Sequence, residues 1–97
     1  MEKYKALVVC GTGMGSSLML KIQDERVVKD NDLPVIVQSD VLSAAKGADA
    51  DFFISMMDLV EILSATGKPI VGIKNIVSRP EILAGIQKQI AAFEEDK

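Results

Sequence analysis

A five-residue apolar run that leads directly into a glycine-rich loop constrains the fold of this chain more than any other feature. The run is Ala6–Cys10, and Gly11 closes it. A short, continuous apolar run of this kind is typical of a central parallel strand whose two faces are both covered. The stretch from Ser16 to about Asp30 contains no Pro or Gly and is rich in good helix formers, which predicts a helix. The first unit is therefore expected to be a strand, a glycine loop and a helix.

The rest of the sequence repeats this alternation. Short runs of β-branched or aromatic residues predict further strands at 35–38, 51–55 and 69–73. Helices are expected at 40–46, at 58–64 and after residue 78. Strands separated by helices pair in parallel through right-handed crossovers. We therefore expect an α/β fold: an open four-stranded parallel sheet, order 2-1-3-4, with helices on both faces, of the Rossmann-like and phosphatase-loop-like kind.

Polar residues mark the expected starts of the later helices. Asp40 or Ser39 would cap the second helix, and Asp58 would cap the third. The last helix has the clearest signature, because Ser78-Arg79-Pro80-Glu81 is a capping-box pattern with proline in the first turn. Its apolar face is expected from four residues at helical spacing: Ile82, Ile86, Ile90 and Phe93.

The length of the chain limits the number of domains, and its charge limits the classes of binding partner. The chain has 97 residues, with 14 acidic and 11 basic side chains and a formal net charge of −3. Such a length suits one hydrophobic core, so residues 1–97 are expected to form a single domain. The negative balance argues against nucleic-acid binding over a basic face. No apolar run approaches the roughly 18 residues of a membrane span, and the first residues do not resemble a secretion signal.

The counts of cysteine and histidine exclude several kinds of site. The chain has one cysteine and no histidine. A single cysteine cannot form an internal disulfide, so a reducing, cytoplasmic location is expected. Without histidine, serine–histidine–carboxylate catalysis lacks its base and the usual zinc sites lack their ligands. We expect no metal and no cofactor.

The glycine loop is the best candidate for chemistry. In the 2-1-3-4 order it follows the central first strand at the topological switch point, where open α/β sheets bind ligands. Glycine allows positive φ and close approach, and consecutive N–H groups at a helix start can then surround a phosphate. No charged residue occurs from Gly11 through Leu20 to repel that anion. The expected phosphate-binding residues are Gly11, Thr12, Gly13, Met14, Gly15, Ser16 and Ser17.

Three better-known glycine-rich motifs do not match this loop. A dinucleotide fingerprint needs its third glycine one residue later, where Ser16 stands. A nucleotide P-loop needs a lysine directly after its last glycine, whereas Lys21 lies a turn into the expected helix. A cysteine phosphatase loop needs an arginine six residues after its cysteine, and that position is again Ser16. Without this bidentate clamp, hydrolysis of phosphate esters is poorly supported.

Cys10 stands at the head of this arginine-free cradle and is the candidate nucleophile. The N–H groups and dipole that bind phosphate also stabilise a thiolate, which could attack a phosphoryl group lying in the loop. The plain alternative is a small buried apolar residue followed by a tight turn. The residues by themselves leave both interpretations open.

The segment from Leu7 to Lys21, LVVCGTGMGSSLMLK, closely resembles the B subunit of bacterial sugar phosphotransferase systems, in particular its ascorbate-type branch in a superfamily with lactose and galactitol types. Weaker similarity continues through Ala48-Asp49 and Val71–Asn75. The resemblance implies a phosphocysteine intermediate on Cys10. The thiol takes a phosphoryl group from a phosphohistidine on the A subunit and delivers it to the sugar held by the membrane C subunit.

The expected function is therefore that of a cytoplasmic phosphoryl carrier, acting as a monomer and without inserting into the membrane. The alternatives are a regulatory domain of the same fold that is controlled by phosphorylation, a low-activity cysteine phosphatase, and a structural module with an inert cysteine. The sugar and the partner subunits are not readable from this chain.

Several residues outside the loop have two interpretations. Asp58 is expected to cap a helix, with general-acid action as the alternative. Lys74 is expected to be a solvated surface lysine, with attraction of phosphate as the alternative. Met56 and Met57 would belong to the core or to an adaptable partner surface. Around the first helix turns, an apolar rim suited to docking two partners in turn is expected from Leu18, Met19, Leu20 and Ile22.

Overall fold

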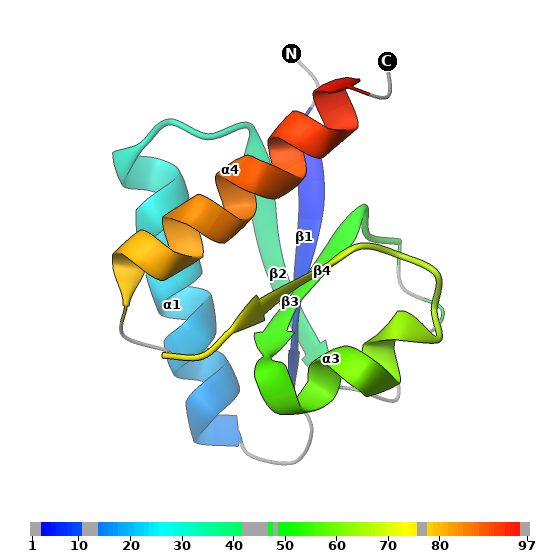
Figure 1. Cartoon of the computed structure of the whole chain (residues 1–97). Helices are drawn as coiled ribbons and strands as arrows, with labels where there is room; N and C mark the ends of the chain where they lie inside the picture. The colour runs from blue at the N-terminus through cyan, green and yellow to red at the C-terminus, as the bar shows by residue number, and fades with distance from the viewer. Residues whose placement is uncertain (1–2, 11–13, 42–46, 48, 76–77, 96–97) are drawn as a thin grey trace.

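A computed structural model describes residues 3–10, 14–41, 47, 49–75 and 78–95 (Figure 1). The elements in this part of the chain are β1 (Tyr4–Cys10), α1 (Met14–Asp30), β2 (Val35–Val41), β3 (Phe52–Met56), α3 (Met57–Ser64), β4 (Ile70–Ile73) and α4 (Arg79–Glu95). Outside the interval between β2 and β3, their order confirms the alternation of strands and helices that the sequence predicts.

The four strands form one parallel sheet in the order β2-β1-β3-β4, as predicted. β1 pairs with β2 along its whole length, from Tyr4 opposite Val35 to Cys10 opposite Val41. On its other side β1 pairs with β3. The first strand is therefore internal to the sheet, and its continuous apolar run follows from having both faces covered.

Alternate residues of the strands enter two hydrophobic clusters on opposite faces of the sheet. Ala6 and Val8 pack with residues of α1 and α4, which lie against each other (Figure 1). Leu7 and Val9 pack with Leu63 of α3. Helices thus cover both faces, and the two-sided core fixes the position of β1 and of the loop that follows it.

Two glycines allow the helices to approach the edge strand β4 closely. A Cβ built on Gly85 of α4 would lie 2.6 Å from Cγ1 of Val71, and one built on Gly72 would lie 2.5 Å from Sδ of Met57 in α3. Either contact is much closer than carbon or sulfur atoms tolerate. The absence of a side chain is therefore a packing requirement at both positions.

The second predicted helix is partly wrong. β2 continues through Val41, so Ser39 and Asp40 are strand residues and not helix caps. The reason is that β1 offers pairing partners as far as Cys10, and this tertiary pairing outweighs the local preference of Ser and Asp for a cap. The rest of that predicted helix, 42–46, lies outside the described residues.

The predicted cap of the third helix is also wrong. α3 begins at Met57 directly after β3, and Met56 occupies the capping position in an extended conformation without a side-chain cap bond. Asp58 is instead in the first helical turn. There its carboxylate still interacts favourably with the positive end of the helix dipole.

The start of α1 also differs from the prediction. This helix begins at Met14, two residues before the predicted start at Ser16.

The apolar face of α4 is as predicted: Ile82 and Ile86 are buried, and Ile90 and Phe93 pack against the same cluster. The predicted capping box between Ser78 and Glu81 is wrong. Ser78 donates its backbone N–H to the Asn75 carbonyl, and the carboxylate of Glu81 accepts bonds from Lys74 and Asn75 instead. Glu81 reaches further back along the chain because the turn after β4 passes beside the first turn of α4.

Candidate phosphoryl-transfer site

The candidate nucleophile lies at the carboxyl end of the sheet. Cys10 is the last residue of β1, and its backbone is paired with Val41 of β2. The chain passes from β1 through α1 to β2 on one side of β1, whereas β3 pairs with the opposite side of β1. This is the switch point of the sheet, where open α/β sheets place their ligands.

The predicted phosphate-binding residues divide into two groups. Gly11, Thr12 and Gly13 lie outside the described residues. The others, Met14, Gly15, Ser16 and Ser17, are the first four residues of α1, and the first turn of this helix contains no acidic residue. The first four N–H groups of an α-helix have no partner within the helix and carry its positive dipole end. Such a helix start, four residues after a cysteine, is able to bind an anion and to stabilise a thiolate.

The ends of β3 and β4 lie at the same edge of the sheet. Met56 is paired with Ile73, and both are the last residues of their strands. Lys74 follows Ile73 and is exposed. Its N–H donates to Glu81 Oε2 at 2.9 Å, and the N–H of Asn75 donates to Glu81 Oε1 at 2.9 Å. These two backbone bonds, with a smaller contribution from the Lys74 charge, hold the pKa of Glu81 below its usual value.

The predicted apolar rim is only partly present. Met19 and Ile22 are 44% and 41% exposed, whereas Leu20 is buried in the core below α1. The side chain of Leu18 lies outside the described residues. The two methionines where β3 meets α3 differ in the same way, because Met56 packs against the core and Met57 is 47% exposed. The prediction for Leu20 is wrong because Leu20 lies on the core-facing stripe of α1, which also includes Asp24 and Val27.

One titratable residue on that stripe was missed by the sequence analysis. Asp24 is fully buried, four residues after Leu20 and three before Val27, and neither of its carboxyl oxygens has a hydrogen-bond partner among the described residues. Burial, and to a smaller degree the charge of Glu25, raises the pKa of Asp24 to about 8. The spacing from Leu20 and Val27 is the sequence signal that could have revealed it.

The family of the chain is shown by comparison with known proteins. Residues 5–88 match the family model described as the PTS system, lactose/cellobiose-specific IIB subunit. The chain belongs to the PTS IIB family. It is therefore a IIB subunit of a sugar phosphotransferase system, and IIB components of these systems are phosphotransferases.

Individual IIB proteins support this assignment. The chain is 31% identical over 85 residues to an ascorbate-specific PTS system EIIB component of Mycoplasma pneumoniae, a match that covers 84% of this chain and 90% of the relative. It is 30% identical over 77 residues to the component of the same description in Salmonella choleraesuis, covering 76% of each. The lactose-specific IIB domain from Streptococcus pneumoniae has the same fold, with a TM-score of 0.66, 14% identity, and 93% and 97% coverage of the two chains.

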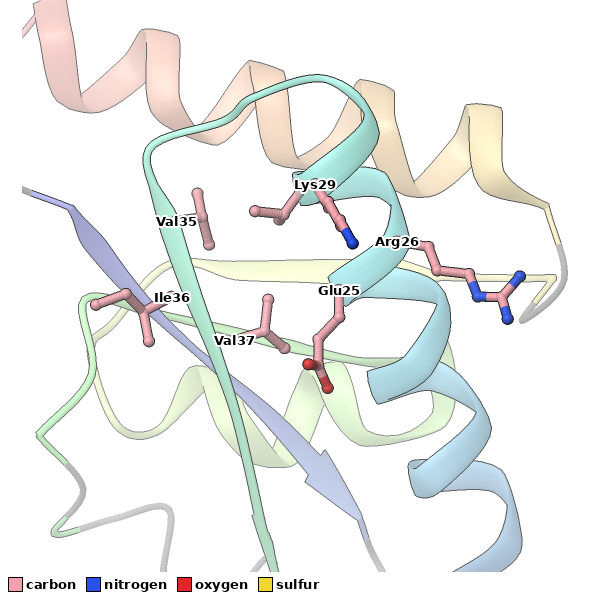
Figure 2. A pocket seen from close by; sticks show the side chains of 7 residues that line it. Glu25, Arg26, Lys29, Val35, Ile36 and Val37 are labelled. Carbon is pink, nitrogen blue, oxygen red and sulfur yellow. The ribbon is translucent and has the colours of Figure 1, made fainter.

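A groove of about 390 Å³ on this IIB chain lies away from the candidate site (Figure 2). It runs between the second half of α1 and the edge strand β2, and its lining includes Val28, Lys29 and Val37. Its strand residues pair with the start of β1, whereas Cys10 is at the other end of that strand. None of the predicted site residues lines this groove.

The part of the chain that the structure describes contains no group of three or more His, Cys, Asp or Glu side chains that could hold a metal ion. Within the same residues, no helix has the length and apolar character needed to cross a membrane.

Proposed function

We propose that this IIB chain carries a phosphoryl group on Cys10, between a phosphohistidine on the A subunit and the sugar at the membrane C subunit. The observation that carries the proposal is the position of Cys10. The only cysteine of the chain ends the central strand at the switch point, four residues before the start of a helix whose first turn has no acidic residue. A phosphorylated thiol at this place would have its negative charges beside the N–H groups of a helix start.

The transfer is a substitution at phosphorus. The thiolate of Cys10 donates an electron pair and forms the S–P bond while the N–P bond of the phosphohistidine breaks. The imidazole nitrogen leaves with that electron pair and takes up a proton. In the second transfer a sugar hydroxyl is the nucleophile: it releases its proton and forms the O–P bond while the S–P bond breaks, and the thiolate of Cys10 leaves with that electron pair. Stabilisation of the thiolate by the helix start would favour both steps, because the thiolate is the attacking group in the first and the departing group in the second.

The residues proposed to bind the phosphoryl oxygens are those of the loop and the helix start: Gly11, Thr12, Gly13, Met14, Gly15, Ser16 and Ser17. They would act through backbone N–H groups and, at Thr12, Ser16 and Ser17, through hydroxyl groups. We further propose an ascorbate-type system, on the ground that the similar proteins from Mycoplasma and Salmonella are described as ascorbate-specific.

The test is intact-mass measurement after incubation with the phosphorylated A subunit of the same transport system. We expect a gain of one phosphoryl group, which prior alkylation of Cys10 prevents. Adding the sugar-loaded C subunit in membranes should remove the group and produce sugar phosphate, and ascorbate should be the substrate among the sugars tried. A mass that stays unchanged with a competent donor would contradict the carrier function.

A further inference from the structure

The turn after β4 lies level with Cys10 across the sheet. Val8 of β1 is paired with Ile54 of β3, so extending this register by two residues brings Cys10 level with Met56. Met56 is in turn paired with Ile73 of β4. Neighbouring strands are about 4.8 Å apart, so the extended register would separate the backbones of Cys10 and Ile73 by about 10 Å. Lys74, the next residue, therefore leaves the sheet two strands away from the candidate nucleophile.

A carboxylate from another element fixes this turn. Glu81 in the first turn of α4 accepts two backbone hydrogen bonds of 2.9 Å, one from Lys74 and one from Asn75. Bonds to a charged acceptor are stronger than those between neutral groups. The lowered pKa of Glu81 keeps the acceptor ionised at neutral pH. Two consecutive peptide groups at the end of β4 are thus held by one side chain.

Lys74 is suited to act toward the loop as a cation. The stretch from Gly11 through Leu20 has no charged residue of its own. The ammonium of Lys74 is on an exposed, flexible four-carbon stem, and the distance to Cys10 is comparable with the Debye length of about 8–10 Å. Other basic residues near α1 are engaged there: Arg79 donates Nε to Gln23 Oε1 at 2.9 Å, and Lys21 Nζ lies 3.7 Å from Glu25 Oε1.

We propose that Lys74 supplies the cation that stabilises the phosphoryl group on Cys10, and that Glu81 is the positioning residue that holds its turn in place. This inference rests on the proposed carrier function and adds two residues to that site. Lys74 forms and breaks no bond in the transfer. It remains protonated while the S–P bond forms and the N–P bond breaks, and it offsets the charge gathered on the phosphoryl oxygens. Glu81 acts chiefly through the two peptide groups that it binds, because its interaction with the Lys74 charge is the smaller one.

The first measurement is the rate at which the chain accepts phosphoryl from its phosphorylated A subunit. Lys74→Gln should slow acceptance about three- to tenfold and Lys74→Glu more, because a charge at this distance is only partly screened. Lys74→Arg should restore most of the rate. Glu81→Asp keeps the negative charge but shortens the side chain, so it should weaken the two backbone bonds and slow acceptance by a smaller factor. The matched control is Lys88→Gln, which makes the same charge change at an exposed position more than two turns into α4.

The second measurement needs no phosphoryl donor. Alkylation of Cys10 by iodoacetamide is followed against pH, with and without inorganic phosphate. Lys74→Gln should move the midpoint of the profile to higher pH and weaken protection by phosphate, and Lys74→Glu should do both to a larger extent. The profiles of Lys74→Arg and Lys88→Gln should match that of the wild type. Glu81→Asp should move the midpoint in the same direction while its circular dichroism stays unchanged.

The outcomes separate this inference from the proposed function. If Lys74→Glu accepts phosphoryl at the wild-type rate and shows the wild-type alkylation profile, the role of Lys74 is overturned while the carrier function stands. If Lys88→Gln slows acceptance as much as Lys74→Gln, only net charge matters and the positional argument is overturned. If the wild type accepts no phosphoryl but its alkylation profile depends on Lys74, the carrier function fails and the electrostatic coupling stands.

Discussion

At the scale of single residues, Asp24 is the least expected feature of the molecule. A carboxyl group on the core-facing stripe of α1, without a hydrogen-bond partner in the described residues, is energetically costly when ionised. Burial raises its pKa from 3.8 to about 8 in the folded chain. At neutral pH the folded state therefore binds a proton there that the unfolded state has released. The raised pKa of this group links the stability of the chain to pH.

We expect Asp24→Asn to raise the free energy of unfolding at pH 8 by about 2–4 kcal/mol, with little effect near pH 4. The sign follows from the raised pKa. The protonated form of Asp24 is present in both states below about 3.8, and its contribution to stability is lost as pH rises from there toward about 8. Urea unfolding of both proteins between pH 4 and pH 8 tests this. Parallel stability profiles for the variant and the wild type would show that Asp24 is not the linked group.

The second prediction at this scale concerns Cys10. Because serine is nearly isosteric with cysteine, Cys10→Ser should keep the fold and lose phosphoryl acceptance completely. No histidine is present to act as the base that a serine nucleophile needs. Circular dichroism checks the fold, and intact-mass measurement with the phosphorylated A subunit checks acceptance. Acid-stable phosphate on the variant would instead indicate a serine or threonine acceptor.

At the scale of elements, the approach of α4 to β4 depends on one missing side chain. A methyl group on Gly85 would lie 2.6 Å from Cγ1 of Val71, a buried residue of β4. We expect Gly85→Ala to destabilise the chain by about 1–3 kcal/mol by overpacking, although alanine is intrinsically the better helix former. The control is Gln87→Ala at an exposed position of the same helix. Equal unfolding midpoints in urea for the two variants would contradict the close-packing argument.

The elements also show what the sequence can and cannot predict. Continuous apolar runs and the alternation of strands with helices were sufficient for the parallel sheet and its order. The errors occur where a distant element decides a local question. β1 extends β2 through Ser39 and Asp40, and the turn after β4 draws the carboxylate of Glu81 away from Ser78. Such contacts are not encoded in the spacing of residues along one segment.

The parts of the candidate site differ in how directly the sequence points to them. Cys10 and the start of α1 are recognisable because the chemistry of the loop depends on consecutive residues. The turn at Lys74 is placed at the same end of the sheet by the pairing of β1 with β3, the pairing of β3 with β4, and the bond to Glu81. None of these contacts can be predicted from the local sequence, so the sequence analysis left the role of Lys74 open. Asp24 escaped notice because polar residues are expected on the outer face of a helix, and its position on the inner face needed the packing of α1 to be known.

At the scale of the whole molecule, the question is whether a phosphocysteine on this chain is passed on or hydrolysed. A cysteine phosphatase clamps the phosphoryl oxygens with an arginine and activates water on its own. Here Ser16 stands at the arginine position. A carrier needs less of its own machinery, because each partner subunit can contribute groups to the transition state in which it takes part. It also benefits from slow hydrolysis, because water attack would waste the phosphoryl group.

We therefore expect the isolated chain to turn over aryl phosphates negligibly while it exchanges phosphoryl reversibly with the phosphorylated A subunit. Both activities are measured on one preparation, the first by release of the coloured phenol and the second by intact mass. Cys10→Ser is the control for each. Ser16→Arg should slow the relay, because an added guanidinium would hold the phosphoryl group in the loop, and it should raise ester hydrolysis at most weakly. Rapid aryl-phosphate hydrolysis by the wild type that disappears in Cys10→Ser would contradict the carrier function and indicate a phosphatase. The same cysteine would then be passing its phosphoryl group to water.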